Sequence, residues 1–343
     1  MGATIKDIAK AVGVSPSTVS RVMNQTAPIS EEIKAKVYAA MKEMDYHPNV
    51  GARNLAKGNT NTIALIIDAQ DEGAFSNSFF NRSVYAIERI AQENGYNLLI
   101  SNDGPQKPSA IKDLVYGKKV DGIIVPSSIL KKKLKIFLLE NNMPFVMLGE
   151  EAEIKGDICW VDINNFQGSI LAVQHLIDRG YKNLIYIGDN RKTTFSKRRT
   201  EGFYYGKLPD IQREAIFVEG QNKIREEVIN SIEKKRVDAV ICANNVFAYE
   251  VIQAIKETGH RIPKDIGIVT FDNHPFAEYL EPPVTAIDVD THKLGELAAK
   301  SLIKLIKEEK IEKADRLILP ELIIRESSFG HAINKREGRI RRE

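Results

Sequence analysis

Apolar residues recur at intervals of three and four along the first fifty residues, which is the spacing of amphipathic helices. One apolar face of a first helix consists of Ile5, Ile8, Ala9 and Val12. Gly13 permits a turn, and Ser15 followed by Pro16 can open a second helix as its N-cap and its first residue. A third helix starts at Ser30 and has an inner face of Ile33, Val37, Ala40 and Met44. The pattern predicts a small all-helical module.

From Thr62 onward the pattern changes to short apolar runs that alternate with helical stretches. The runs of strand length are 63–67, 97–100, 122–125, 145–148, 184–187, 239–242 and 266–269. The helical stretches between them include 79–94, 166–179, 222–235 and 245–258. Such alternation is typical of parallel sheets with helices on both faces. Seven or more such strand–helix units are more than a single sheet readily accommodates. We therefore predict two Rossmann-like lobes with a ligand cleft between them.

Composition adds limits on the class of protein. The chain has 343 residues, 43% hydrophobic and 28% charged, which fits two or three globular domains. No apolar run approaches the ~20 residues that span a membrane, and the first residues do not resemble an export signal. We therefore expect a cytoplasmic protein with no membrane partner. Cys159 and Cys242 lie in apolar runs of strand type and are expected to be buried small hydrophobes.

The net charge of +3 is unevenly distributed. Residues 1–60 carry +3 and residues 331–343 carry +3, whereas residues 61–330 carry −3. A basic module on a slightly acidic body is a weak indication of a polyanionic partner, and chance explains it equally well. The run Lys131-Lys132-Lys133-Leu134-Lys135 is expected to be a solvated helix face, and His175 a surface or internally bonded residue.

The segment from Ile5 to Asn24 is physically a helix, a glycine turn and a second helix. The second helix is packed inward by Val14, Val19 and Val22. The N-terminal half of this helix then presents Pro16, Ser17, Ser20 and Arg21 outward, as the recognition helix of a helix-turn-helix does. Arg21 can bind a guanine or a phosphate, and hydroxyl groups can bind base edges or the backbone. A three-helix bundle with a polar surface is the other interpretation of this pattern.

Residues 4–24, TIKDIAKAVGVSPSTVSRVMN, resemble the head of the LacI/GalR family of bacterial transcription regulators at almost every position. The resemblance continues with MDYHPN at 44–49 and ends with LPELIIRES at 319–327. It implies a helix-turn-helix DNA-binding head at 1–48, a hinge helix and linker at 49–60, a two-lobed ligand-binding and dimerisation domain at 61–330, and a basic tail at 331–343. The two-lobed domain of this family resembles a periplasmic sugar-binding protein.

The resemblance also assigns residues to the operator DNA. The implied DNA-binding set is Thr4, Ser15, Pro16, Ser17, Thr18, Ser20, Arg21, Asn24, Asn49, Ala52 and Leu55. Pro16 offers only apolar contact, for instance to a thymine methyl group, so Ser17 and Arg21 carry the hydrogen-bonded specificity.

By the same resemblance, residues 49–57 form the hinge helix that enters the minor groove. Leu55 is its apolar wedge, Ala52 lies near the groove floor and Asn49 caps the helix. Packing of Leu55 against the lobe below is the alternative. Gly51 costs about 1 kcal/mol relative to alanine, so we expect folding of this helix to depend on DNA.

Local motifs carry the family's effector site onto this chain. Arg199 opens RTEGF at 199–203, Asn244 lies in ANN at 243–245, and Asp272 lies in FDN at 271–273. By resemblance these three bind a sugar-like effector, and Phe79 or Phe80 lines the pocket.

The chain departs from the family in three polar positions. Asn164 and Asn245 replace carboxylates, and Gly149, with Glu150 beside it, stands where an aspartate is frequent. The loss of acceptor charge favours a sugar phosphate or sugar acid over a sugar, or a pocket that no longer binds sugar tightly. Arg198 and its neighbour Lys197 are expected to be solvated.

No Ser/His/Asp grouping, metal-ligand spacing or phosphate loop occurs in the sequence, so we expect no enzyme, no cofactor and no metal. The predicted function is a homodimeric regulator, a repressor of carbohydrate metabolism genes, that binds a pseudo-palindromic operator and is controlled by a small effector. The alternative keeps the DNA-binding role but replaces the small effector with a protein corepressor. Whether the effector acts as inducer or corepressor is open.

Overall fold

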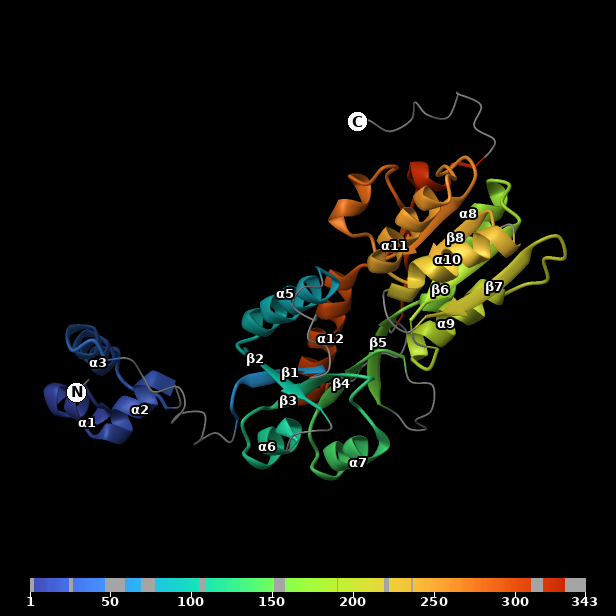
Figure 1. Ribbon diagram of the computed structural model, residues 1–343. Helices are drawn as coiled ribbons and strands as arrows, with labels where there is room; N and C mark the ends of the chain where they lie inside the picture. The colour runs from blue at the N-terminus through green and yellow to red at the C-terminus, as the bar shows by residue number, and fades with distance from the viewer. Residues whose placement is uncertain are drawn as a thin grey trace. The chain divides into compact units, whose positions relative to one another are not determined.

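The computed structural model describes most of the chain (Figure 1). The described residues are 3–24, 27–46, 59–68, 78–104, 109–150, 158–189, 191–218, 222–235, 237–309 and 317–330. They fall into two compact units, Met1–Thr60 and Asn61–Glu343, which we call the head and the body. The predicted hinge helix, with Asn49, Ala52 and Leu55, and the basic tail lie outside the described residues.

The head contains the three predicted helices: α1 (Ile5–Val12), α2 (Pro16–Asn24) and α3 (Glu31–Glu43). Gly13 ends α1 with a φ of 76°, a left-handed conformation that glycine adopts without steric cost. The Ser30 hydroxyl caps α3 by accepting a hydrogen bond from the Ile33 N–H. The core of the head is built on four fully buried side chains, Ile8, Val19, Val22 and Val37.

The body contains two six-stranded sheets, which confirms the two-lobe prediction. The first lobe has the strand order β11-β5-β4-β3-β1-β2, and the second has β12-β10-β9-β8-β6-β7. The strands of the first sheet are β1 (Thr62–Asp68), β2 (Asn97–Asp103), β3 (Gly122–Pro126), β4 (Phe145–Leu148), β5 (Cys159–Ile163) and β11 (Leu317–Ile318). Those of the second are β6 (Asn183–Gly188), β7 (Gln212–Phe217), β8 (Ala239–Cys242), β9 (Gly267–Phe271), β10 (Thr285–Asp288) and β12 (Glu321–Ile323).

Among the described strand pairs only β10 and β12 run antiparallel. Strands β5, β7, β10, β11 and β12 are not among the seven predicted runs, although Cys159 of β5 was placed in a run of strand type. The side chains of β5 and β7 alternate in burial, and β10, β11 and β12 have two to four residues. Continuous apolar runs therefore marked the strands with an unbroken apolar sequence, the edge strand β2 included, and not the alternating or short ones.

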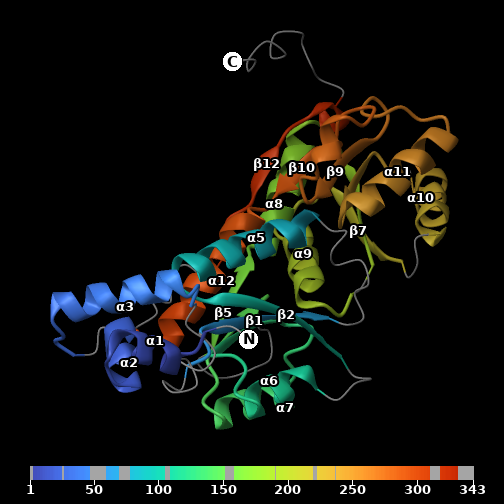
Figure 2. The ribbon, with the colours of Figure 1, turned by 90° about the vertical axis from the view of Figure 1, so that its left-hand side faces the viewer.

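Helices cover both faces of each sheet, as the parallel pattern predicted. The body helices are α5 (Ser78–Glu93), α6 (Ala110–Tyr116), α7 (Lys132–Glu140), α8 (Asn165–Asp178), α9 (Thr194–Tyr204), α10 (Asn222–Lys235), α11 (Asn245–Glu257) and α12 (Thr291–Ile306). Helices α6 and α7 pack on one face of the first sheet, and α10 and α11 pack on one face of the second. Helix α8 lies against the opposite face of the second sheet, beside β10 and β12 (Figure 2).

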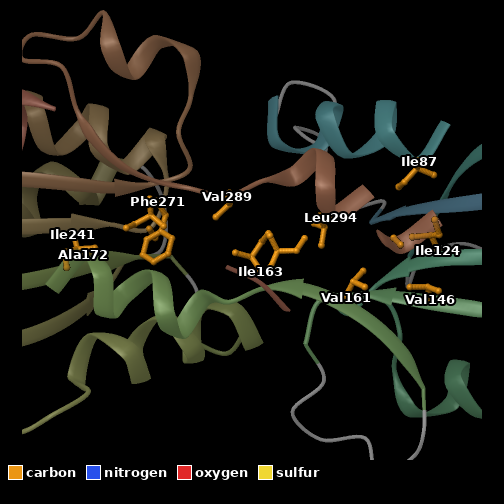
Figure 3. Packing of buried hydrophobic residues seen from close by; sticks show 14 of the residues in the cluster. Ile87, Ile124, Val146, Val161, Ile163, Ala172, Ile241, Phe271, Val289 and Leu294 are labelled. Carbon is orange, nitrogen blue, oxygen red and sulfur yellow. The ribbon is translucent and has the colours of Figure 1, made fainter. Parts of the chain in front are cut away.

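One buried cluster runs through both lobes (Figure 3). It joins Phe271 and Val289 of the second lobe to Ile163, Leu294 and Ile124 of the first. The chain passes between the sheets three times, after β5, after β10 and between β11 and β12. Helix α12 follows a strand of the second lobe but packs on α5 and the first sheet. The lobes thus share a core along these crossings.

The structure of the body tests three predictions about individual side chains. His175 is buried and its Nε2 lies 2.7 Å from the Ser328 hydroxyl, so it is an internally bonded core residue. The prediction that the lysine run is a solvated helix face was wrong for one residue. Lys135 is buried, whereas Lys131, Lys132 and Lys133 are exposed. Lys135 falls on the side of α7 that carries the buried Leu138, and helical spacing places it inward. Both cysteines are buried, as expected.

Candidate nucleic-acid interface and effector site

The outward face of α2 holds the predicted base-reading residues. Val19 and Val22 are buried, and the same helix exposes Pro16, Ser17 and Arg21. The exposed residues thus occupy the face opposite the core, so the local geometry is that of a recognition helix.

A hydroxyl network orders the first turn of this helix. Ser15 Oγ lies 2.7 Å from Ser17 Oγ and 2.9 Å from Thr18 Oγ1, and it accepts a hydrogen bond from the Thr18 N–H at 3.1 Å. Ser17 and Thr18 are therefore already engaged with the cap. Arg21, in contrast, is exposed on the same helix.

Thr4, Asn24 and Ser20 make contacts within the head. The Thr4 hydroxyl and N–H both donate to the Asp7 carboxylate, at 2.7 and 2.9 Å, and form the capping box of α1. Asn24 donates to the Ser20 hydroxyl at 3.2 Å. These bonds hold the helix ends, and contacts of these residues with DNA stay predictions.

In the body, Arg199 of α9 is buried and held from three sides. Its Nε donates to Asn165 Oδ1 at 2.8 Å, and its Nη1 donates to the Ala243 carbonyl at 2.6 Å. The guanidinium carbon lies 3.8 Å from the centroid of the Phe271 ring, a cation–π contact in a desolvated place. Phe195 adds a second ring at 5.4 Å. The guanidinium is thereby fixed at the carboxyl ends of β8 and β9.

Asp272 follows β9 directly and lies near this guanidinium. Its backbone N–H donates to the Ile287 carbonyl, and its φ of 68° is left-handed. Its Oδ1 is buried and has no hydrogen-bond partner among the described residues. Burial raises the pKa of Asp272, and the charge of Arg199 opposes that rise. Two residues predicted from separate motifs are thus brought together.

The other predicted effector residues are placed differently. Asn244 caps α11, and its Oδ1 accepts a hydrogen bond from the Phe247 N–H at 3.1 Å, so only its amide group is left for a ligand. Phe80 of α5 is partly buried and packs against the shared core. The side chain of Phe79 lies outside the described residues.

Sequence reasoning missed Asp162, at the end of β5 in the first lobe. Desolvation raises the pKa of Asp162 to about 6, although the N–H groups of Glu150 and Ile163 each donate to it at 2.7 Å. The charge of Arg199 acts on it across the lobes. A polar residue at the carboxyl end of a parallel strand was the signal that could have found it. Asn165, which orients Arg199, was also missed.

The expectation that Arg198 is solvated was wrong. Arg198 donates Nε and Nη2 to the two carboxylate oxygens of Glu150, at 2.7 and 2.6 Å, and Nη1 to Glu201 at 2.8 Å. Glu150 follows β4 of the first lobe and Arg198 lies on α9 of the second, so the pair joins the lobes. Lys197, beside it, is exposed as expected.

Among the described residues, no three His, Cys, Asp or Glu side chains are grouped so that they could hold a metal ion. No helix in the described part of the chain has the length and apolar character needed to cross a membrane.

The chain is similar in sequence to known bacterial regulators. Residues 4–49 match the model of bacterial regulatory proteins of the lacI family, and residues 173–328 match a periplasmic binding protein-like domain. The PurR transcriptional repressor of Mannheimia succiniciproducens is 30% identical over 334 residues, which cover 95% of this chain and 98% of that protein. The MalR regulator of Streptococcus pneumoniae is 30% identical over 328 residues, covering 91% and 95%.

Solved structures share the fold. The lac repressor dimer bound to operator and the anti-inducer ONPF aligns with a TM-score of 0.80 at 23% identity, covering 96% of this chain and all of that one. The CelR–cellobiose complex aligns with a TM-score of 0.66 at 24% identity, covering 95% and 99%.

Proposed function

The chain belongs to the LacI family of bacterial regulatory proteins, and we propose that it represses carbohydrate metabolism genes as a homodimer on a pseudo-palindromic operator. As a member of this family it is a DNA-binding transcriptional regulator. A small neutral sugar, bound between the lobes of the body, controls it. The observation that supports the effector site is the buried Asp272 Oδ1, which has no hydrogen-bond partner among the described residues and lies near the fixed Arg199 guanidinium.

DNA recognition is proposed to depend mainly on Arg21. The hydroxyl of Ser17 lies within hydrogen-bond distance of Ser15, so the exposed Arg21 guanidinium is the strongest donor on the exposed face of α2. A guanine offers it two acceptors in the major groove, and Pro16 beside it offers an apolar contact to a thymine methyl. A guanine and a thymine in each half-site are the expected pattern.

The charges around the effector site favour a neutral ligand over the sugar phosphate or sugar acid that the sequence suggested. Arg198 is neutralised by Glu150. The charge of Arg199 then acts on two carboxyl groups, Asp162 and Asp272, and lowers the pKa of each against the rise that burial causes. An anion entering here meets no excess positive charge, whereas sugar hydroxyls can donate to carboxylates and accept from the guanidinium. The pair Asp162 and Asp272 also comes from both lobes, so a ligand that contacts both would couple to their closure.

We propose that the homodimer forms through the exposed edge of the first lobe. Strand β2 is the outermost strand of its sheet, and its Leu99 and Ile100 are exposed. On the neighbouring helix α5 the ring of Tyr85 is 63% exposed. An open edge strand with apolar side chains is a surface that proteins usually cover. Sedimentation of the protein at micromolar concentration tests this: a monomer would contradict the dimer.

A thermal-shift panel tests the effector. The panel contains neutral sugars such as glucose, maltose and cellobiose, together with their phosphates and acids. A ligand at about 100 times its dissociation constant adds about 2.7 kcal/mol of stability, which raises the melting midpoint by several degrees. Selective shifts by neutral sugars support the proposal, and selective shifts by phosphates contradict it. No shift with any small molecule, together with stable binding of a phosphocarrier protein, would support the protein corepressor instead.

Operator selection tests the DNA-binding part independently. The purified protein selects sequences from a random duplex library, and the enriched sites are compared. An inverted repeat with a guanine in each half supports the dimeric, Arg21-dependent reading. Enrichment of a single, non-repeated site would contradict it.

A further inference from the structure

A second pair of buried polar groups lies next to the proposed effector site. Tyr186 of β6 is fully buried, and Ser196 of α9 is nearly so. Beyond the contact between them, neither Tyr186 Oη nor Ser196 Oγ has a hydrogen-bond partner among the described residues. Burial raises the pKa of Tyr186, and Ser196 opposes that rise as a side-chain hydrogen-bond partner, so the two hydroxyls lie together. Their elements, β6 and α9, lie side by side (Figure 1).

The tyrosine hydroxyl is located at the carboxyl end of the second sheet. A Cβ built on Gly188, the last residue of β6, would lie 3.3 Å from Tyr186 Oη and 3.5 Å from Ala243 Cβ. Ala243 is also the residue whose carbonyl accepts from Arg199. Ser196 precedes Arg199 by one helical turn on α9. The hydroxyl pair therefore adjoins the Arg199 guanidinium.

The rest of the Tyr186 ring is well accounted for by packing. Its centroid lies 6.0 Å from that of Phe203 and 6.1 Å from that of Phe217, inside the shared core. A phenylalanine would make these contacts equally well. The hydroxyl adds only a buried polar group whose one hydrogen-bonding neighbour among the described residues is the Ser196 hydroxyl. Such a group in a native protein calls for an explanation outside its own packing.

Tyr181, in the same lobe, shows the ordinary arrangement. It is equally buried, and its hydroxyl donates to the Pro263 carbonyl at 3.0 Å. The fold is thus able to satisfy a buried tyrosine where the role is structural.

We propose that Tyr186 and Ser196 together bind one hydroxyl group of the effector and determine which sugars are accepted. This inference rests on the proposed sugar effector. A sugar hydroxyl both donates and accepts, so it can accept from one member of the pair and donate to the other. A phosphate or carboxylate cannot donate, and two of the donor groups of Arg199 are already used within the protein.

The first turns of α9 connect the pair to the other lobe. This part of the helix carries Ser196, Arg198 and Arg199, and Arg198 donates a hydrogen bond to Glu150 of the other lobe. A ligand that displaces Ser196 would therefore act through one helix on the ion pair between the lobes.

The first test compares Tyr186→Phe with Tyr181→Phe in the full-length protein without ligand. Loss of the Tyr186 hydroxyl, which has no partner except Ser196 among the described residues, changes the melting midpoint little. Loss of the bonded Tyr181 hydroxyl lowers the midpoint by about 2–4 °C. An equal drop for Tyr186→Phe would show that its hydroxyl is satisfied within the protein, by a permanent water for example, and would overturn the inference.

The second test uses the neutral sugar that binds the wild-type protein most tightly in the panel, and its monodeoxy derivatives. We expect Tyr186→Phe to weaken binding of that sugar about tenfold in calorimetry, with operator affinity unchanged. One deoxy derivative should bind the wild-type protein about tenfold more weakly than the parent sugar does. The same derivative should bind Tyr186→Phe almost as well as the parent sugar binds that variant, because both changes remove the same hydrogen bond. Ser196→Ala should behave in the same way.

The outcomes separate this inference from the proposed function. If a sugar binds but Tyr186→Phe and Ser196→Ala bind it as well as the wild type does, the hydroxyl pair is not a subsite and only this inference fails. If no sugar binds the wild type, the proposed effector class fails and the inference fails with it.

Discussion

At the scale of single residues, the buried Arg199 guanidinium donates to Asn165 and to the Ala243 carbonyl, and its charge acts on Asp162 and Asp272. Arg199 and Asp272 were predicted from separate motifs and lie together. Asp162 and Asn165 were missed because they reach Arg199 only through the pairing of β5 and the start of α8. Pairings of this kind depend on which strands become neighbours, and no local spacing of residues encodes that.

Arg21 gives the first prediction at this scale. Arg21→Lys keeps the charge but loses the planar pair of donors, so it should lower specific operator affinity about 10- to 100-fold while non-specific binding changes little. Fluorescence anisotropy with the selected operator and with a scrambled duplex measures both affinities. Lys36→Ala is the control, because Lys36 is paired with Glu32 on α3. Equal losses on both duplexes would make Arg21 a phosphate contact.

Asp162 gives the second, through its pKa of about 6. The folded state holds this proton more tightly than the unfolded chain, whose carboxyl titrates near 3.8. The protonated carboxyl thus contributes stability below about pH 4, and this contribution is lost as the pH rises through 6. Asp162→Asn should raise the melting midpoint at pH 7.5 and have little effect at pH 4. Asp113→Asn, at an exposed site, is the control. An unchanged midpoint at pH 7.5 would contradict the raised pKa.

At the scale of elements, prediction succeeded where the hydrophobic period was long and regular. The helices of the head and the central strands of both sheets match the pattern. Strand β7 and the short strands β11 and β12 did not match it, because the side chains of β7 alternate in burial and strands of two or three residues carry little periodic signal. The position of helix α12 could not be predicted for another reason. Its packing on the first lobe depends on where the chain crosses between the lobes and not on the sequence of the helix itself.

The contact between α12 and α5 gives the element-scale prediction. A Cβ at Gly295 would lie 2.3 Å from the Ser83 carbonyl oxygen, so the two helices approach closely only because this residue is glycine. Gly295→Ala should push α12 away and destabilise the body by about 1–3 kcal/mol, although alanine favours helices. Urea unfolding measures the change, with Lys300→Ala on the exposed side of α12 as control. A gain in stability would show that the helices have room.

At the scale of the whole molecule, the ion pair between Glu150 and Arg198 links the two lobes outside their shared core. Its side chains are 19% and 35% exposed, so solvent limits its contribution to about 0.5–1 kcal/mol. That is small for stability but sufficient to bias an equilibrium between two arrangements of the lobes by two- to fivefold. The pair therefore matters for regulation more than for folding.

A charge swap tests this role. Glu150→Arg and Arg198→Glu each place like charges across the lobes and should favour their separation, whereas the double variant restores the attraction with its sign reversed. Distances between dyes on the two lobes, measured without ligand, should lengthen in each single variant and return in the double. Glu201→Gln is the matched control, because it removes a bond to the same arginine within one lobe. Operator affinity should follow the dye distances if lobe closure controls the head, and a constant affinity across all four variants would separate closure from DNA binding.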